Sequence, residues 1–216
     1  KSVTARSTDF NMAETKAPSD GVITGYGVID GNLVYVYSQD ASVLNGTVGE
    51  MHAKKISALY DLAMKTGAPV IGLVDCAGMR LQEATDALEA FGGIYLKQTM
   101  ASGMIPQITA VFGTCGGGMA VVPALTDFTF IESKKGKMFV NSPNALDGNY
   151  TEKCDTASAE FQSKETGLID AVESEEEILA EIRQLIGLLP SNFEDNDSFE
   201  ECTDDLNRAC EDIAAC

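Results

Sequence analysis

Two glycine-bearing turns are the residues of this sequence best suited to chemistry. The run from Phe112 to Ala120 holds three consecutive glycines, Gly116, Gly117 and Gly118, between a strand-like run and a run of small apolar residues. Glycines between a strand and a helix leave backbone N–H groups bare at a helix start, where the helix dipole favours negative charge. Such a turn can hold a phosphate group, or an oxyanion that develops on a carbonyl. A tight turn, in which only glycine permits close packing or a positive φ, is the alternative.

A second turn of the same kind comes earlier in the chain. The turn from Cys76 to Arg80 follows the apolar run from Pro69 to Asp75, which is typical of a strand buried on both faces. In parallel sheets, ligands bind beyond the carboxyl ends of the strands. Two amide-rich turns that end two strands of one sheet lie on the same edge, and this arrangement predicts a binding site there.

The cysteines allow a different chemistry. The chain has six, and they form no CxxC pair and no zinc-ribbon spacing, so we expect reduced thiols in a cytoplasmic protein and no metal site. Cys76 and Cys115 lie in the two turns, where a thiol nucleophile paired with His52, the only histidine, is conceivable. Packing of small side chains is the interpretation that we favour for both thiols.

Composition and charge disfavour several classes of function. The formal net charge of -18 argues against nucleic-acid binding, which requires a basic surface. Residues 173–216 hold 2 Lys/Arg and 14 Asp/Glu, so this end carries two thirds of the excess charge. No apolar run reaches the ~20 residues of a membrane span. Residues 1–20 lack the apolar centre of a secretory signal. These features favour a globular cytoplasmic protein.

The apolar pattern divides the chain into three parts. We expect an extended or loosely ordered N-terminal arm over 1–20, a compact domain over 21–190, and an acidic C-terminal tail over 191–216 that docks on a partner and forms a small helix at 203–215. A hairpin followed by alternating helices and strands predicts an α/β fold with a largely parallel sheet. The expected strands are 22–29, 33–39, 69–75, 106–112, 128–131, 137–141 and 167–172, and the main helices are 50–65, 82–101, 151–163 and 175–189.

Six stretches of the compact domain together resemble one protein family. They are Gly21–Gly27, Val36–Asp40, Glu50–Ile56, Gly67–Leu73, Ala101–Ile108 and Pro123–Phe128. In this order, over about 21–190, the sequence resembles the N-terminal domain of the biotin-dependent acyl-CoA carboxyltransferases, the family of propionyl-CoA carboxylase and methylmalonyl-CoA decarboxylase.

The resemblance implies a crotonase-like (ClpP/crotonase) ββα superhelix and chemistry by backbone amides. In the family, the N-terminal domain binds the acyl-CoA and holds the thioester enolate in an oxyanion hole. A homologous C-terminal domain holds biotin, and the active site forms where the two domains meet across a dimer interface. Carboxybiotin releases CO2, the ureido group of biotin accepts the α-proton and the enolate attacks CO2; decarboxylases run these steps backwards.

Position by position, the resemblance assigns roles to the two turns. The expected oxyanion donors are the N–H groups of Gly117 and Gly118, helped by Gly78 or Met79. The residues expected to bind the substrate are Ala77, Gly116, Met119, Arg80 and Lys54. An ion pair of Arg80 with Glu83 or Asp75 is an equal alternative to a contact with CoA. For Lys54, a solvated place on a helix surface is favoured over a contact with the CoA phosphates.

The sequence departs from the family pattern at two places. The family usually has Gly-Gly-Ala before the arginine, where this chain has Ala77-Gly78-Met79. The bulky Met79 and Met119 would narrow the acyl pocket or change its specificity. The family's Gly-Gly-Ala with a following histidine, expected near 156–162, is absent.

The chain stops after the domain that resembles the family's N-terminal half. We therefore expect a split enzyme in which this chain is the acyl-CoA half. The expected partners are a homologous C-terminal-domain subunit, a biotin carrier protein and, as a further possibility, biotin carboxylase, together in a hetero-oligomer. Two alternatives stay open: a biotin-independent crotonase-type enzyme acting on CoA thioesters, and a non-catalytic scaffold subunit.

Overall fold

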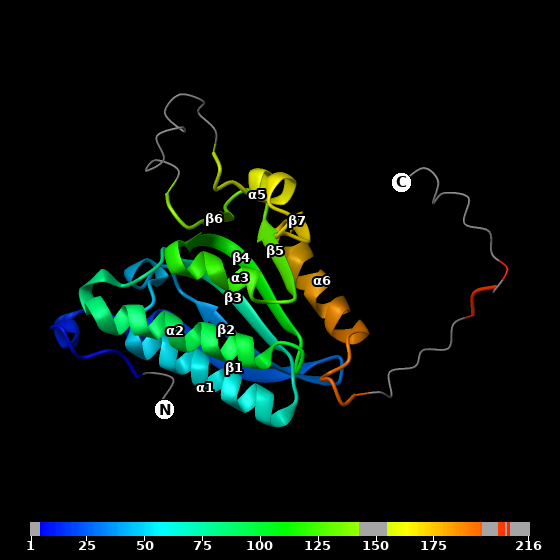
Figure 1. Ribbon diagram of the computed structural model, residues 1–216, viewed down its shortest axis with the longest axis horizontal. Helices are drawn as coiled ribbons and strands as arrows, with labels where there is room; N and C mark the ends of the chain where they lie inside the picture. The colour runs from blue at the N-terminus through cyan, green and yellow to red at the C-terminus, as the bar shows by residue number, and fades with distance from the viewer. Residues whose placement is uncertain (1–4, 143–154, 196–202, 206, 208–216) are drawn as a thin grey trace.

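A seven-stranded sheet with helices on both faces forms the body of the protein (Figure 1). The computed structural model describes residues 5–142, 155–195, 203–205 and 207. The strand order is β1-β2-β3-β4-β5-β7, and β6 pairs with β4. Among the strands that the structure describes, β1 and β2 pair antiparallel and every other pair is parallel. The expected α/β fold with a largely parallel sheet is confirmed.

The chain begins the sheet with the predicted hairpin. Strands β1 (Val22–Ile29) and β2 (Asn32–Gln39) pair along their whole length. The connecting residues Asp30 and Gly31 both have positive φ, 49° and 97°. Two such residues in succession form the turn whose twist matches that of a two-residue hairpin, and Asp-Gly is a preferred sequence for it.

The remaining elements alternate between helices and parallel strands. In chain order after the hairpin they are α1 (Glu50–Thr66), β3 (Val70–Cys76), α2 (Ala84–Ala101), β4 (Gln107–Gly116), α3 (Val121–Ala124), β5 (Phe128–Glu132), β6 (Lys137–Phe139), α5 (Ala159–Glu165), β7 (Ala171–Glu173) and α6 (Glu175–Leu188). Short 3-10 helices occur at η1 (Met12–Glu14), η2 (Pro18–Gly21), η3 (Leu44–Gly46), η4 (Leu81–Glu83) and η5 (Gly117–Ala120).

Alternating side chains of the central strands build one core on each face of the sheet. Val70 and Val74 of β3 belong to the cluster that includes residues of α1 and α2, whereas Ile71 packs in the cluster with α6. Helix α6 contributes Ile178, Ile182 and Ile186, which recur every four residues and so lie on one helix face. Each fully buried side chain of this kind contributes roughly 1.5–3 kcal/mol to folding.

Several element boundaries differ from the expected ones. Strand β4 continues to Gly116, four residues further than expected, because β6 pairs with its last three residues. The last strand is Ala171–Glu173 rather than 167–172. Part of the expected helix 151–163 and most of the expected helix 203–215 lie outside the described residues. Within the described ranges, no helix combines the length and apolar character that a membrane crossing requires.

Of the extended or loosely ordered arm that we expected at the N-terminus, the described residues 5–20 are packed against the body and are not loosely ordered. Met12 and Ala17 are buried and pack with Val43, while Ser7 and Asp20 are 3% and 0% exposed. The segment is fixed because its polar groups meet buried partners on the body. At the other end, the Asn192 side chain donates to Gly67 O at 2.9 Å, so the chain just past α6 is also fixed.

Candidate active site

The two glycine turns follow neighbouring strands and touch each other. Cys76, the last residue of β3, pairs with Cys115 of β4, so Ala77–Met79 and Gly116–Met119 leave the same edge of the sheet side by side. A Cβ placed on Gly78 would lie 3.1 Å from Gly116 O, and one on Gly117 would lie 3.7 Å from the Gly78 Cα. The predicted meeting of the two turns is confirmed.

A bulge in β4 brings the second turn to this position. The pairing shifts from Val74–Val111 to Cys76–Cys115, so β4 uses more residues than β3 over the same distance. The Asp75 carboxylate fills the bulge and accepts a hydrogen bond from Thr114 N–H at 2.9 Å. Gly113 leaves the space for it, since a Cβ there would lie 2.3 Å from Asp75 Oδ1. Asp75 therefore fixes the bulge and does not pair with Arg80.

The close approach explains why both turns carry glycine. Gly78 and Gly117 have φ of 120° and 58°, a region that other residues adopt only with strain. A side chain on Gly116 would meet Ala77 O at 2.9 Å, and one on Gly118 would meet the Tyr95 hydroxyl at 3.0 Å. The tight-packing interpretation of these glycines is thus also confirmed, and it is compatible with a binding role for their amides.

In the first turn, the direction of each amide decides which can serve as a donor. The Gly78 N–H group donates to Cys76 Sγ at 3.3 Å, and the Gly78 carbonyl accepts from Val48 N–H at 2.9 Å. None of the described peptide bonds is cis, so the Met79 N–H group lies on the opposite side of the Gly78–Met79 peptide from that carbonyl. It points away from Val48. Between the two expected donors of this turn, the geometry therefore favours Met79 over Gly78.

The second turn is the start of a 3-10 helix. Gly117 and Gly118 are the first residues of η5, and the N–H groups at a helix start have no acceptor within the helix. Two side chains hold the backbone carbonyls of this turn. The Tyr95 hydroxyl donates to Gly118 O, and the Cys115 thiol donates to Met119 O at 3.3 Å. These contacts fix the turn without using its first amides.

The two thiols support the turns and are poorly suited to act as nucleophiles. Burial raises the pKa of Cys76 to about 12 and raises that of Cys115 well above its ordinary value. His52 makes its ring contacts with Asp20 and Gln39 rather than with a cysteine. A thiolate–imidazolium pair is therefore not formed, which agrees with the packing interpretation of both cysteines.

Arg80, expected at the substrate, lies instead in a buried cluster of charges. Its guanidinium is 0% exposed and pairs with Asp20 Oδ1 at 2.9 Å and with Glu83 Oε1 at 2.8 Å. It also donates to Thr47 O at 2.8 Å. The ion pair with Glu83 is confirmed, whereas direct contact with CoA is incompatible with a fully enclosed guanidinium in this arrangement.

The same carboxylates cap helix α1. The first three N–H groups of the helix, those of Glu50, Met51 and His52, donate to Glu83 Oε2 at 2.7 Å, Ser7 Oγ at 3.3 Å and Asp20 Oδ2 at 2.8 Å. Helix starts favour negative charge, so the two carboxylates are stabilised by the helix as well as by Arg80.

A chain of hydrogen bonds leads from this cluster to the second turn. The His52 Nδ1–H group donates to Asp20 O at 2.8 Å, which leaves Nε2 as an acceptor for the Gln39 side-chain amide at 3.1 Å. That amide also donates to Met119 Sδ at 3.7 Å. Burial lowers the pKa of His52 to about 4, so the neutral ring that this pattern requires is present near neutral pH.

The Met119 side chain is a part of the core. It is 0% exposed and belongs to the core formed with α1 and α2. The expected narrowing of the acyl pocket by Met119, or a change of its specificity, stays a prediction. Met79, in the first turn, is only partly buried.

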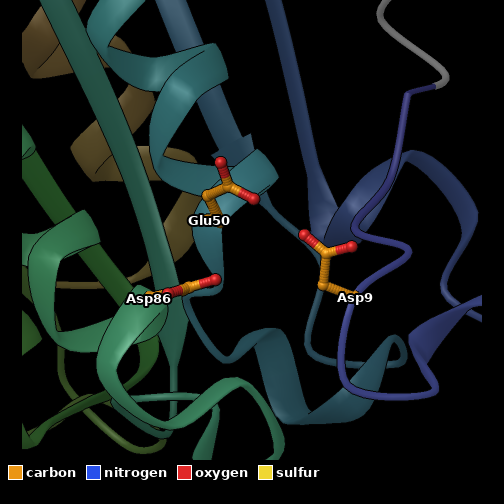
Figure 2. Close-up of side chains that lie close together, drawn as sticks. All are labelled: Asp9, Glu50 and Asp86. Carbon is orange, nitrogen blue, oxygen red and sulfur yellow. The ribbon is translucent and has the colours of Figure 1, made fainter.

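Lys54 lies on the surface of α1 and pairs with Glu50. It lines a groove of about 300 Å³ between α1 and α2 together with the acidic residues Glu50, Asp86 and Glu89. Nearby, the carboxylates of Asp9, Glu50 and Asp86 come from three different segments and have oxygens within 4.8 Å of one another (Figure 2). This density of negative charge is unfavourable for phosphate groups, so the favoured interpretation of Lys54 as a surface residue fits better than a contact with CoA.

Comparison with known proteins decides the family. The family model described as the carboxyl transferase domain matches residues 1–215. The chain belongs to the carboxyl transferase family. It is 41% identical over 218 residues to the propionyl-CoA carboxylase beta chain of Roseobacter denitrificans, covering 94% of this chain and 43% of that protein. It is 41% identical over 212 residues to the methylmalonyl-CoA decarboxylase subunit alpha of Veillonella parvula, covering 96% of this chain and 42% of that protein.

Solved structures of carboxyl transferases share the fold. A structure of transcarboxylase 12S with hydrolysed methylmalonyl-coenzyme A bound has a TM-score of 0.85 and 32% identity, over 94% of this chain and 40% of that one. A malonate decarboxylase hetero-tetramer from Pseudomonas, with a TM-score of 0.75 and 20% identity, supports the fold alone. The crotonase-like fold is thus confirmed. The chain spans about two fifths of the length of the curated relatives named here.

Three groups that shape the candidate site were not found from the sequence. Asp75 was considered only as a partner of Arg80, Cys76 as a packing residue or a nucleophile but not as a hydrogen-bond acceptor, and Asp20 only as part of the N-terminal arm. A carboxylate at the end of a buried strand, just before a glycine turn, was a usable signal for Asp75. The contacts of Cys76 and Asp20 depend on the folded chain and have no such local signal.

Proposed function

We propose that this chain forms the acyl-CoA side of a carboxyltransferase that moves a carboxyl group between biotin and an acyl-CoA thioester. The contact between the two glycine turns carries the proposal, together with membership of the family. The thioester carbonyl would lie beside the turns and accept hydrogen bonds from the N–H groups of Met79, Gly117 and Gly118. Ala77 and Gly116 would border the acyl group.

Backbone amides suit this reaction because its difficult step creates an enolate. Negative charge grows on the thioester oxygen as the α-carbon loses a proton or CO2, and fixed donors stabilise that charge more than they stabilise the neutral thioester. Removing a single donor of this kind typically lowers kcat by about 100- to 1,000-fold. The turns are held by Cys76, Cys115 and Tyr95, so their amides need little reorganisation when charge develops.

Biotin would be carried by a partner protein and supplies the CO2 and the acceptor for the α-proton. We assign no residue of this chain to it. Gly78 and Gly117 carry no side chain, so no Cβ stands between the two turns at these positions.

A second carboxyl transferase domain, on this polypeptide or on another subunit, would complete the site. Relatives named propionyl-CoA carboxylase and methylmalonyl-CoA decarboxylase are more than twice as long as this chain. Leu88, Leu96 and Met100 of α2 are 64%, 57% and 51% exposed and lie four or eight residues apart, so they form one apolar row. Helix α2 also carries Tyr95, which contacts the second turn. We propose this row as the surface that the second domain covers, in a hetero-oligomer with a biotin carrier.

The proposed location is the cytoplasm, and two other functions compete with the main proposal. The free, buried thiols of Cys76 and Cys115 fit the reducing cytoplasm. A biotin-independent enzyme acting on CoA thioesters and a scaffold subunit are the competing functions, and they differ from the main proposal in whether avidin blocks activity and whether activity exists.

The test is to purify the protein with its natural partners, identify them by native mass spectrometry, and probe for biotin with streptavidin. The complex is then given methylmalonyl-CoA, or propionyl-CoA with bicarbonate and Mg-ATP as the source of carboxybiotin, and carboxyl gain or loss is followed by mass spectrometry with and without avidin. Avidin-sensitive turnover and a biotinylated partner are the expected results. Turnover that avidin leaves unchanged would replace the proposal with the biotin-independent enzyme, and no turnover on any acyl-CoA would favour the scaffold.

A further inference from the structure

Arg80 joins the first glycine turn to a group of buried charges. It directly follows Met79, and its guanidinium pairs with Asp20 and Glu83 while all three side chains are at most 2% exposed. Removing such charges from water is costly and is tolerated only where the geometry is good and the remaining hydrogen-bonding positions are filled. Here they are filled by Thr47 O, by Ser7 and by the first amides of α1.

The backbone on either side of Arg80 fixes the peptide that carries the Met79 amide. Arg80 N–H donates to Val48 O at 2.9 Å, and Val48 N–H donates to Gly78 O at 2.9 Å. The guanidinium holds the preceding residue of the same segment through Thr47 O at 2.8 Å. These hydrogen bonds hold residues 47 and 48 against one side of the first turn, and the Met79 N–H group points to the opposite side of that turn.

We propose that Arg80 is a positioning residue for the enolate-forming step, acting through residues 47 and 48 to hold the Met79 N–H group in the direction of the thioester oxygen. Asp20 and Glu83 hold the guanidinium in place. This inference rests on the proposed function, because it gives a role to an amide of that same site. Arg80 itself touches no substrate in this account.

The N-terminal segment takes part through the same cluster. Ser7 N–H donates to Asp20 Oδ1 at 3.0 Å, and Ser7 Oγ donates to Glu83 Oε2 at 3.0 Å and to Asp20 Oδ2 at 3.4 Å. A single side chain thus contacts both carboxylates that hold Arg80. Ser7→Ala loosens the cluster without leaving a buried charge unpaired, so it is a milder perturbation than a change of Arg80.

The test compares binding of a neutral acyl-CoA with binding of an enolate analogue. The analogue is a CoA thioether that bears a nitronate anion, whose two oxygens match the charge and shape of a thioester enolate, and the neutral ligand is propionyl-CoA. Dissociation constants of both are measured by titration calorimetry on the full chain in the complex in which it is purified. The preference for the nitronate over propionyl-CoA is the quantity compared.

Arg80→Lys and Arg80→Met should lower that preference at least about tenfold while affinity for propionyl-CoA changes by less than about threefold. Ser7→Ala should lower it in the same direction by a smaller factor, which keeps the idea testable if the Arg80 variants fold poorly. Ile182→Ala is the control, because it destabilises the core on the opposite face of the sheet, with α6. Its thermal midpoint should fall without a change in preference.

The outcomes separate the two claims. A wild-type complex that does not prefer the nitronate removes the proposed function, and the role of Arg80 with it. A wild-type complex that prefers the nitronate, with folded Arg80 and Ser7 variants that keep the full preference, overturns the role of Arg80 alone. If Ile182→Ala loses as much of the preference for the nitronate as the Arg80 variants do, Arg80 acts only through the stability of the fold.

Discussion

Replacing Gly117 with alanine separates the cost of backbone strain from the loss of an amide site. Gly117 has φ of 58°, and Gly167, on the surface after α5, has φ of 67° with no atom within 4 Å of an added Cβ. A non-glycine residue in this region costs roughly 1–2 kcal/mol. Both Gly117→Ala and Gly167→Ala should therefore fold and lower the thermal midpoint by similar amounts, about 2–8 °C for a protein of this size.

The two variants should differ sharply in activity. The Cβ at position 117 would lie 3.7 Å from the Gly78 Cα, in ordinary contact, so it fills the space between the turns without breaking the fold. We expect kcat for carboxyl transfer to fall by about 100-fold in Gly117→Ala, as for loss of one oxyanion donor, and to stay within about twofold of wild type in Gly167→Ala. Gly117→Val should abolish turnover for the same steric reason. The assay is the avidin-sensitive conversion of the acyl-CoA, run beside thermal unfolding of each variant. A folded Gly117→Ala complex with wild-type turnover would refute the placement of the thioester oxygen between the turns.

Other side chains give further tests. Cys115→Ala should keep kcat within about threefold of wild type, and an inactive Cys115→Ala enzyme would return a thiol mechanism to consideration. Cys76→Val removes the acceptor of the Gly78 N–H group and should lower kcat about tenfold. Iodoacetamide at pH 8 should label neither thiol until urea unfolds the protein, because burial raises the pKa of Cys76 to about 12 and raises that of Cys115 well above its ordinary value; peptide mass spectrometry checks this. The pKa of His52 is about 4 when folded against 6.5 for the free side chain, so the unfolded chain binds the proton first and stability falls as the pH drops from 6.5 through 4. Wild type should lose about 2 kcal/mol more than His52→Gln between pH 8 and pH 5 in urea unfolding, and an equal loss in both would remove His52 as the cause. Leu88→Glu and Leu96→Glu should leave the thermal midpoint of the isolated chain unchanged and weaken assembly in native mass spectrometry; intact assembly would place the second domain elsewhere.

The sequence predicted the site where local signals and sheet geometry were enough. Continuous apolar runs before Cys76 and before Gly113 indicated two buried parallel strands, and the glycines after them marked the turns. Because parallel strands end at one edge, the meeting of the turns followed from the order of elements alone.

The contacts that the sequence did not predict join residues far apart in the chain. Asp20 and Arg80 are separated by 60 positions, and neither residue carries a local sign of its partner. The Met119 side chain lies in the core and accepts a hydrogen bond from the Gln39 side-chain amide, a contact that no periodicity near the turn indicates. The length of β4 depends on β6, a three-residue strand too short to be reliable from its own sequence.

The choice between Gly78 and Met79 as a donor also required the fold. It depends on the thiol of Cys76, two residues before Gly78, and on Val48, which belongs to a loop before α1. Such contacts, rather than residue type, set the direction of an amide, so the sequence could predict the turn but not which of its N–H groups donates.

The central claim is that backbone amides of the two turns hold the thioester carbonyl, and vibrational spectroscopy of that carbonyl tests it most directly. Propionyl-CoA carrying 13C at the thioester carbonyl is bound to the complex, and the infrared difference spectrum against the unlabelled ligand isolates its stretching band. The account predicts a shift to lower wavenumber on binding to wild type and to Gly167→Ala, with most of that shift lost in Gly117→Ala. A band at its solution position in the bound wild-type complex, or an undiminished shift in Gly117→Ala, would contradict it.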